Sequence, residues 1–197
     1  MNIIKFLQNH RILHNTIYYL GTKRARKELY PKVINQISHS HKILDLGSGS
    51  CCLANILLKE GYDLSLLDVA DISFVDDLHP QIYDGQTIPF PDKYFDIVLL
   101  LTVLHHTPNP ELIIQEADRV GRKVIIIEDV FNNFWKMKLG HFLDSFTNME
   151  FSDHPHSNKS DSQWKALFEK NSYKLINSSY TTLWKFGLSA TYVIESI

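Results

Sequence analysis

Cysteine is scarce in this chain of 197 residues: there are two, Cys51 and Cys52, and they are adjacent. Adjacent cysteines lack the usual spacing of a metal-binding pair and are poorly placed to join distant segments. A disulfide-stapled secreted protein is therefore disfavoured, and we expect a cytoplasmic one, because thiols stay reduced there. Glycine and proline are also few, 8 and 7, so no linker rich in them divides the chain. We expect a single domain over residues 1–197.

Neither positive nor negative charge dominates, since the chain has 20 basic and 22 acidic residues and a net charge of −2. This balance provides no overall field for nucleic acid or anionic lipid, so a dedicated nucleic-acid binder is disfavoured. Long hydrophobic runs are missing as well. Charged and histidine residues interrupt the apolar residues of positions 1–20, which argues against a signal peptide or a membrane span there. The composition leaves the oligomeric state open.

The first forty residues are expected to form a helical cap on the domain. Apolar residues recur at helical spacing and place one face of an amphipathic helix against the core, although the same pattern would suit docking on a membrane surface. The basic run at residues 23–27 is most simply a solvated helix face, with binding of a phosphate, an acidic protein or nucleic acid as the alternative. The residues of the expected apolar face are Ile3, Leu7, His10, Leu13, Ile17 and Leu20.

From residue 42 onward, short apolar runs alternate with helical segments, which is typical of a parallel sheet with crossover helices. Several runs are apolar at consecutive positions, as strands covered on both faces must be. Gly61 and Gly121 follow the helical segments 51–60 and 111–120, where a left-handed residue would end each helix. The expected strands are Lys42–Leu46, Leu64–Asp68, Gln81–Tyr83, Phe95–Leu101 and Lys123–Ile127.

Beyond residue 127 the rhythm changes. Residues 131–160 hold many aromatic residues and then a polar loop, and we expect them to form an insertion that acts as a lid over an acceptor pocket, with ordinary helix packing as the alternative. Ser160 and Gln163 form a capping box for a helix that runs through Lys170. Two further strands are expected at 173–178 and 190–196. The aromatic residues proposed for the lid are Phe131, Phe134, Trp135, Phe142 and Phe146.

A glycine turn directly follows the first expected strand, in the sequence Asp45-Leu46-Gly47-Ser48-Gly49. Glycine lets the backbone approach a ligand closely, and the helix that begins beyond it offers free N–H groups. Open α/β sheets bind ligands at this position. A dinucleotide fold would need a third glycine near position 52, where this chain has Cys52, so a nicotinamide cofactor is disfavoured.

Asp68 ends the second expected strand, 21 residues after Gly47. An acidic residue about 20 residues beyond the glycine turn is placed to accept hydrogen bonds from ribose hydroxyls. The alternative role of Asp68 is to cap the turn at the end of its own strand. The glycine turn and Asp68 together favour a nucleoside-containing ligand.

Five segments, taken in order, carry a resemblance to a known enzyme family: Ile43–Ser50, Leu66–Asp68, Asp84–Asp92, Phe95–Val98 and Val103–His106. Over about residues 42–129 the chain resembles class I S-adenosylmethionine-dependent methyltransferases, and within them the methyltransferase type 11, or ubiquinone/menaquinone-biosynthesis-like, group. The resemblance implies a Rossmann-like three-layer α/β sandwich with a mainly parallel seven-stranded sheet whose last strand is antiparallel.

The same resemblance implies the cofactor and its site. S-adenosylmethionine would bind with its methionine part beside the glycine loop, which Asp45 orders, while Asp68 holds the ribose and Asp84 lies near the adenine. From the residues alone, Asp84 would either reach this cleft or stabilise its own turn. Leu100 and Leu101, at the end of strand four, would supply packing. The full set of expected cofactor-binding residues is Asp45, Gly47, Ser48, Gly49, Asp68, Asp84, Gly85 and Leu101.

The chain departs from the family between strands two and three. Only residues 69–80 separate them, while a full crossover needs a dozen or more residues with a helix. That helix must be very short or missing. Another segment, such as the first helix, would then cover the cofactor, or the protein is an inactive relative that serves as an adapter.

The acceptor side of the site is less defined, because methyl transfer requires mainly alignment, exclusion of water and, for some acceptors, removal of a proton. His105 and His106 follow strand four at the ligand edge, and either is a candidate base or a structural histidine. Glu128 and Asp129, at the end of strand five, face the same edge, with capping of the next helix as the alternative. No metal is expected, because no recognised ligand spacing joins His141, Asp153, His154 and His156.

The sequence therefore predicts a methyltransferase that uses S-adenosylmethionine and acts on a small or lipid-like molecule. Two alternatives stay open: a noncatalytic adapter with the same fold, and a protein or RNA methyltransferase, for which the basic run at residues 23–27 is the only hint.

Overall fold

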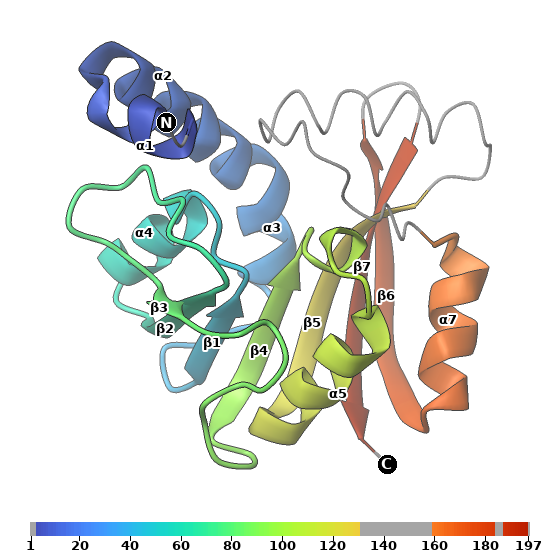
Figure 1. Ribbon diagram of the computed structural model, residues 1–197. Helices are drawn as coiled ribbons and strands as arrows, with labels where there is room; N and C mark the ends of the chain where they lie inside the picture. The colour runs from blue at the N-terminus through green and yellow to red at the C-terminus, as the bar shows by residue number, and fades with distance from the viewer. Residues whose placement is uncertain (1–2, 131–158, 184–186, 197) are drawn as a thin grey trace.

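The computed structural model describes residues 3–130, 159–183 and 187–196, and in them a seven-stranded sheet forms the centre of the molecule (Figure 1). The strand order is β3-β2-β1-β4-β5-β7-β6. All neighbouring pairs are parallel except the two that involve β7, which runs antiparallel to β5 and β6. The strands are β1 (Lys42–Leu46), β2 (Asp63–Asp68), β3 (Gln81–Ile82), β4 (Phe95–Leu101), β5 (Gly121–Val130), β6 (Tyr173–Leu183) and β7 (Gly187–Ser196).

The expected strands are confirmed, two of them to the residue, and so is the antiparallel last strand. β5, β6 and β7 are longer than expected because β5 and β6 both pair with β7 over most of its length. Such pairing extends a strand beyond its apolar run, since the backbone ladder needs no apolar side chain.

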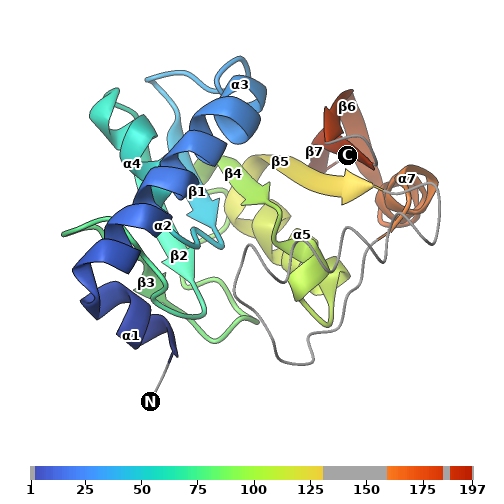
Figure 2. The same cartoon turned by 90° about the horizontal axis from the view of Figure 1, so that it is seen from above.

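Helices cover both faces of the sheet, as the view along the strands shows (Figure 2). Alternate residues of one strand enter opposite cores: Leu44 and Leu46 of β1 pack on the side of α5 and α7, while Ile43 packs on the side of α4. The predicted three-layer arrangement is therefore confirmed. The helical segments are α1 (Ile3–Asn9), α2 (Arg11–Arg24), the π-helical turn η1 (Ala25–Leu29), α3 (Tyr30–Val33), α4 (Cys52–Lys59), the 3-10 turn η2 (Leu104–His106), α5 (Pro110–Val120) and α7 (Asp161–Lys170).

The expected helix ends hold with one exception. The Ser160–Gln163 capping box is present at the start of α7, and Gly61, with φ +88°, follows α4 in the left-handed region. Gly121 is different: its φ is −111° and β5 begins at this residue. A Cβ there would lie 2.6 Å from Val98 Cγ2, so close packing between α5 and β4 requires this glycine, and the predicted left-handed role was wrong.

No helix occurs between β2 and β3, as the short spacing predicted. α1 and α2 pack against this connection instead: Gln8 Nε2 donates to the Ser73 carbonyl at 2.9 Å, and the rings of His14 and Phe74 lie 5.7 Å apart. The first helices thus contact the segment that replaces the usual crossover helix. This contact supports the expectation that another part of the chain compensates for the missing helix.

The single apolar stripe expected over the first twenty residues is wrong, because the helix is interrupted at His10 and α1 and α2 are separate. Leu7 is buried, whereas Ile3 and Leu20 are each 55% exposed. Among the described residues no helix is long and apolar enough to cross a membrane. The lid expected over residues 131–160 and its aromatic residues lie outside the described part of the chain up to residue 158, as do His141, Asp153, His154 and His156.

Candidate active site

The carboxyl ends of β1, β2 and β4 meet at one edge of the sheet, and the predicted glycine loop connects β1 to α4 there (Figure 1). In the family of open α/β sheets this edge is the ligand-binding edge. Gly47 and Gly49 both have left-handed backbones, with φ of +79° and +53°. The loop therefore needs glycine for its conformation as well as for close approach.

The two glycines have different surroundings. A Cβ on Gly47 would lie 2.5 Å from Val103 Cγ2, so the residues after β4 pack directly on the loop. The nearest atom to a Cβ on Gly49 would be the Gly47 carbonyl oxygen at 4.0 Å. The side of Gly49 that lacks a side chain is thus open, and it is the part of the loop that leaves room for a ligand.

Asp68, at the end of β2, is hydrogen bonded to this loop. Its Oδ2 accepts from the Gly49 N–H at 2.8 Å, and its Oδ1 accepts from Val69 and Ala70 at 2.7 and 3.3 Å. The carboxylate is 8% exposed. A carboxylate has about four acceptor positions, so three backbone bonds leave about one for a ligand hydroxyl. Asp68 thus caps its own turn and is bonded to the glycine loop at the same time.

Asp45 is buried beneath the loop, 4% exposed. Burial, and then the neighbouring Asp68 carboxylate, raise the pKa of Asp45 to about 7. The Asp45 backbone carbonyl accepts a hydrogen bond from Ser48 Oγ at 2.9 Å, which ties the loop back to the strand. This contact supports the expected role of Asp45 in ordering the loop, through its main chain.

Asp84 lies in the turn after β3 and is exposed. Its Oδ1 accepts from the N–H groups of Gln86 and Thr87 at 2.8 and 2.9 Å, which hold the pKa of Asp84 below its usual range. Gly85 follows with φ +75°. The turn-stabilising role of Asp84 is therefore present, and none of its described contacts joins it to the glycine loop or to Asp68.

Directly after β4 lies a residue, Thr102, whose unusual backbone conformation the sequence did not reveal. Leu101 is buried on the α4 side of the sheet, and Thr102 follows it with φ +58°. The Thr102 N–H donates to the Ile127 carbonyl at 2.7 Å. A β-branched residue in the left-handed region is strained by about 1–3 kcal/mol, and such strain concentrates at functional sites. No sequence pattern marks this conformation, because nothing in the residue type favours it.

Beyond Thr102, the candidate base His105 forms a buried pair with Glu128 of β5. Nδ1 of His105 lies 2.7 Å from Glu128 Oε2, and the two side chains are 5% and 1% exposed. The other carboxylate oxygen of Glu128 accepts from the Leu104 N–H at 2.7 Å. Glu128 therefore holds η2 and the imidazole together and caps the turn after β4.

His106 and Asp129 complete the expected rim. The rings of His105 and His106 are 4.0 Å apart between centroids and tilted by 44°. Asp129 pairs with Ser189 of β7, whose hydroxyl accepts from Lys32 Nζ of α3 at 2.7 Å. Burial lowers the pKa of Lys32, while Asp129 acts in the opposite direction. Of the four rim candidates, the structure brings His105 and Glu128 into one bonded unit.

The two cysteines lie at the start of α4, and both are free and buried. Cys51 is left-handed with φ +57°, and burial raises the pKa of its thiol to about 12, so it is a packing residue and not a nucleophile. Cys52 contacts α2: a Cβ on Gly21 would lie 2.8 Å from Cys52 Sγ. α2 therefore packs against the helix that begins at the glycine loop (Figure 2).

Metal-ligating side chains do not gather in the described ranges: no group of three or more His, Cys, Asp or Glu that could hold a metal ion occurs there. The candidate site residues in the described ranges are therefore the glycine loop with Asp45 and Asp68, the separate turn at Asp84, and the His105–Glu128 pair.

Comparison with known proteins agrees with this geometry. Residues 44–124 match a family model described as a methyltransferase domain. An uncharacterized protein of Methanocaldococcus jannaschii is 34% identical over 116 residues, 57% of this chain and 52% of that protein. The ubiquinone/menaquinone biosynthesis C-methyltransferase UbiE of Cupriavidus taiwanensis is 30% identical over 112 residues, 49% of this chain and 45% of that protein. The chain spans about half the length of these curated relatives.

Solved structures share the fold at low identity. An S-adenosylmethionine-dependent methyltransferase from Methanosarcina mazei superposes with a TM-score of 0.66 at 16% identity, over 86% of this chain and 98% of that one. Magnesium protoporphyrin IX methyltransferase from Synechocystis, solved with bound SAH, superposes with a TM-score of 0.62 at 12% identity, over 89% and 84%.

A seven-stranded sheet in this order, with β7 antiparallel and a glycine loop after β1, defines a class I S-adenosylmethionine-dependent methyltransferase fold. Within that class of fold, the family model described as a methyltransferase domain matches residues 44–124 of this chain.

Proposed function

We propose that this protein transfers the methyl group of S-adenosylmethionine to a small or lipid-like acceptor. The observation that carries the proposal is the bond between Asp68 Oδ2 and the Gly49 N–H at 2.8 Å. It joins the end of β2 to the open part of the glycine loop, so that a nucleoside and an amino-acid moiety can be held side by side at this edge.

For the cofactor, we propose that Gly49 and Ser48 contact the methionine part and that Asp68 accepts from a ribose hydroxyl through its remaining acceptor position. Leu101 and the turn at Asp84 and Gly85 would border the adenosine. Gly47 would contribute by holding the loop against Val103. The open space at Gly49 supports this fit, because a ligand can approach the backbone there without meeting a side chain.

For the chemistry, the bound cofactor supplies a methyl group on a positively charged sulfur. The protein's own residues must align the acceptor, exclude water and remove a proton where the acceptor carries one. We propose His105 as the group that takes this proton. Glu128, 2.7 Å from Nδ1, fixes the ring and stabilises its protonated form. His106, on the same turn, is the second candidate.

The acceptor class rests on two lines of support. The curated relatives in Cupriavidus and Burkholderia are named as ubiquinone/menaquinone biosynthesis C-methyltransferases. In addition, an apolar side chain packs on the glycine loop, since Val103 lies against Gly47. We further propose residues 131–160 as a lid over the acceptor.

Calorimetric titration with S-adenosylmethionine and S-adenosylhomocysteine tests the first half of the proposal. We expect both to bind, and wild-type protein that binds neither would contradict methyl transfer and favour a noncatalytic adapter. Methyl-labelled S-adenosylmethionine, incubated with lipid, protein and RNA fractions in separate arms, tests the second half. We expect label in the lipid or small-molecule fraction, and label confined to protein or RNA would contradict the acceptor class.

A further inference from the structure

The charge of this protein is unevenly distributed along the chain. Residues 3–33, which form α1, α2, η1 and α3, hold seven Lys and Arg side chains but one acidic side chain, Glu28. This segment therefore carries +6 within a chain whose net charge is −2. The whole-chain balance conceals a local positive field large enough to attract an anionic surface.

The outer side of α2 combines this charge with exposed apolar residues. Ile12, Tyr19, Lys23 and Lys27 follow one another at spacings of seven, four and four residues, which places them on one face of a helix. Ile12 is 72% exposed and Tyr19 is 64% exposed. We call these four residues, with Leu20 beside them, the outer α2 face.

The opposite side of α2 is occupied by the protein itself. Gly21 meets Cys52 of α4, and Ala25 is 2% exposed in the core beside α4. α2 is thus anchored by its inner side. The outer α2 face is left to solvent. The neighbouring helix α1 (Figure 2) also carries exposed apolar residues, Ile3 and Phe6, which are 55% and 39% exposed.

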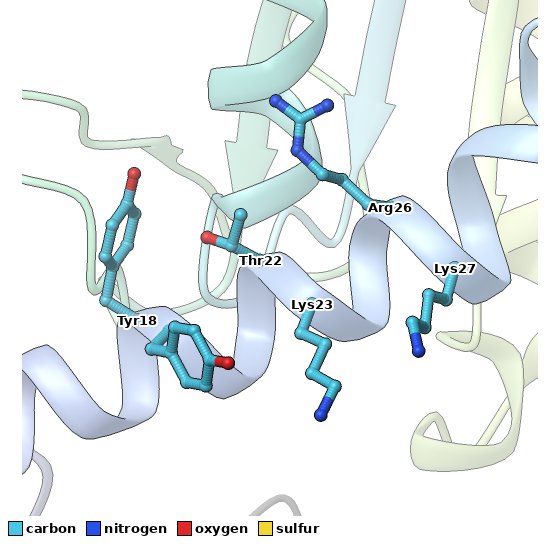
Figure 3. A pocket seen from close by; sticks show the side chains of 6 residues that line it. Tyr18, Thr22, Lys23, Arg26 and Lys27 are labelled. Atoms are coloured by element: carbon cyan, nitrogen blue, oxygen red, sulfur yellow. The ribbon is translucent and has the colours of Figure 1, made fainter.

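A hollow of about 340 Å³ lies along α2 and η1, and Tyr19, Lys23 and Lys27 of this face line part of it. In Figure 3 the Lys23 and Lys27 ammonium groups extend from the same side of the helix, and Arg26 extends from the other side. Within the described part of the chain, Arg24 pairs with Glu28 at 3.5 Å, while no carboxylate pairs with Lys23, Arg26 or Lys27. The residues that line the hollow are Tyr18, Tyr19, Thr22, Lys23, Arg26 and Lys27.

We infer that the outer α2 face docks on the surface of a membrane that contains anionic lipid. The helix lies in the plane of the interface, with Ile12, Tyr19 and Leu20 inserted among the headgroups and Lys23 and Lys27 on their phosphates. Nucleic acid fits less well, because the exposed apolar residues beside the cations have no counterpart on a phosphate backbone. The inference does not depend on the proposed methyl transfer, although it would bring the protein to lipid-like acceptors.

Co-sedimentation of the full chain with vesicles tests this inference. We expect binding to vesicles of equimolar phosphatidylcholine and phosphatidylglycerol, weak binding to phosphatidylcholine alone, and loss of binding as salt is raised. Inorganic phosphate at the same phosphate concentration should not compete, because the inserted apolar residues contribute to binding. Equal binding to both vesicle types, or none to either, overturns the inference.

Two variants locate the face. Lys23→Gln/Lys27→Gln should weaken vesicle binding by about 20- to 30-fold, since each basic residue near an anionic surface contributes about fivefold. Ile12→Ser should weaken it without changing the net charge. The matched control, Lys59→Gln/Lys170→Gln, removes two exposed lysines from other helices and should bind as wild type. Equal loss in the control, or none in either variant, overturns the placement.

A mixed-sequence RNA oligonucleotide distinguishes the rival partner. If RNA binds more tightly than the vesicles and Ile12→Ser leaves that binding unchanged, the face recognises nucleic acid and the inference fails. Because the substituted side chains are exposed, we expect every variant to stay folded. Thermal melting followed by circular dichroism checks this for each variant. Binding of S-adenosylmethionine, measured alongside, is expected to be unchanged, so failure here stays distinct from failure of the proposed activity.

Discussion

His105 Nδ1 and Glu128 Oε2 are 2.7 Å apart, and both side chains are almost fully buried. The pair joins the turn after β4 to the end of β5, and a second bond from Leu104 N–H fixes the carboxylate. Under the proposed mechanism, Glu128 is a positioning residue that acts on the acceptor only through the imidazole.

We therefore expect His105→Asn to lower the rate of methyl transfer by about 10²- to 10⁴-fold, the usual contribution of a general base. Glu128→Gln should lower the rate less and move the acid limb of the pH–rate profile to lower pH, because the carboxylate favours the protonated imidazole. Affinity for S-adenosylmethionine should stay near wild type in both. Glu169→Gln on the exposed side of α7 is the control. A rate loss that merely follows the melting temperature would show a structural role only.

Asp68→Ala should weaken S-adenosylmethionine binding by about 1–3 kcal/mol, the scale of hydrogen bonds to a charged group. The melting temperature should fall as well, since the carboxylate also accepts from Gly49, Val69 and Ala70. Calorimetry and thermal melting measure the two effects. Asp63→Ala, at the exposed start of the same strand, should change neither. Wild-type affinity in a folded Asp68→Ala variant would remove Asp68 from the cofactor site.

Gly47→Ala and Gly49→Ala form a matched pair. Both substitutions place a side chain on a left-handed residue, at a cost of about 1–2 kcal/mol. Gly47→Ala also pushes against Val103 at 2.5 Å, so it should lower stability further, and Val103→Ala should restore part of it. Gly49→Ala should fold and yet lose S-adenosylmethionine affinity, because its Cβ enters open space. If Gly49→Ala binds the cofactor normally, that space is not the ligand's.

The raised pKa of Asp45 predicts how the stability of the protein depends on pH. Its pKa is raised by burial from 3.8 to about 7, so the folded state favours the protonated carboxyl. The contribution of Asp45 to stability is complete below about pH 4 and is lost as pH rises through about 7. Asp45→Asn should therefore be the more stable protein above pH 7, by at most about 4 kcal/mol at 1.36 kcal/mol per pKa unit. Urea unfolding at several pH values measures this, and parallel curves for the two proteins would contradict it.

The positions of the strands along the chain and the position of the glycine loop could be predicted from the sequence because each depends on local pattern. Consecutive apolar residues mark β1, β4 and β5, and the glycines after β1 mark the turn. The resemblance to class I methyltransferases supplied the antiparallel β7, which no local pattern fixes.

The contacts between distant elements could not be predicted in the same way. These contacts form where the ends of strands that are neighbours in space meet, although the residues are far apart in the sequence. They are the contact of Val103 with Gly47, the bond of Asp68 to Gly49 and the pair of His105 with Glu128. Gly121 is a case in which a local pattern gave a wrong prediction. Its place at a helix end suggested a left-handed residue, but glycine is needed there because a side chain would collide with Val98. Thr102 adopts its strained backbone without any signal in the sequence.

The contact between Gln8 and Ser73 spans 65 residues along the chain, and α1 and α2 together bury only Leu7, whereas β1 pairs with β2 and β4 through buried apolar residues. Closing a loop of that length is entropically costly and is repaid by few buried groups, so α1 and α2 should join the sheet late in folding and leave it first. In native-state hydrogen exchange, amides of α1 and α2 should then exchange through a local opening while those of β4 wait for global unfolding. Because the crossover helix is missing, this edge of the sheet is covered by α1 and α2, the helices that we expect to open before β4 does.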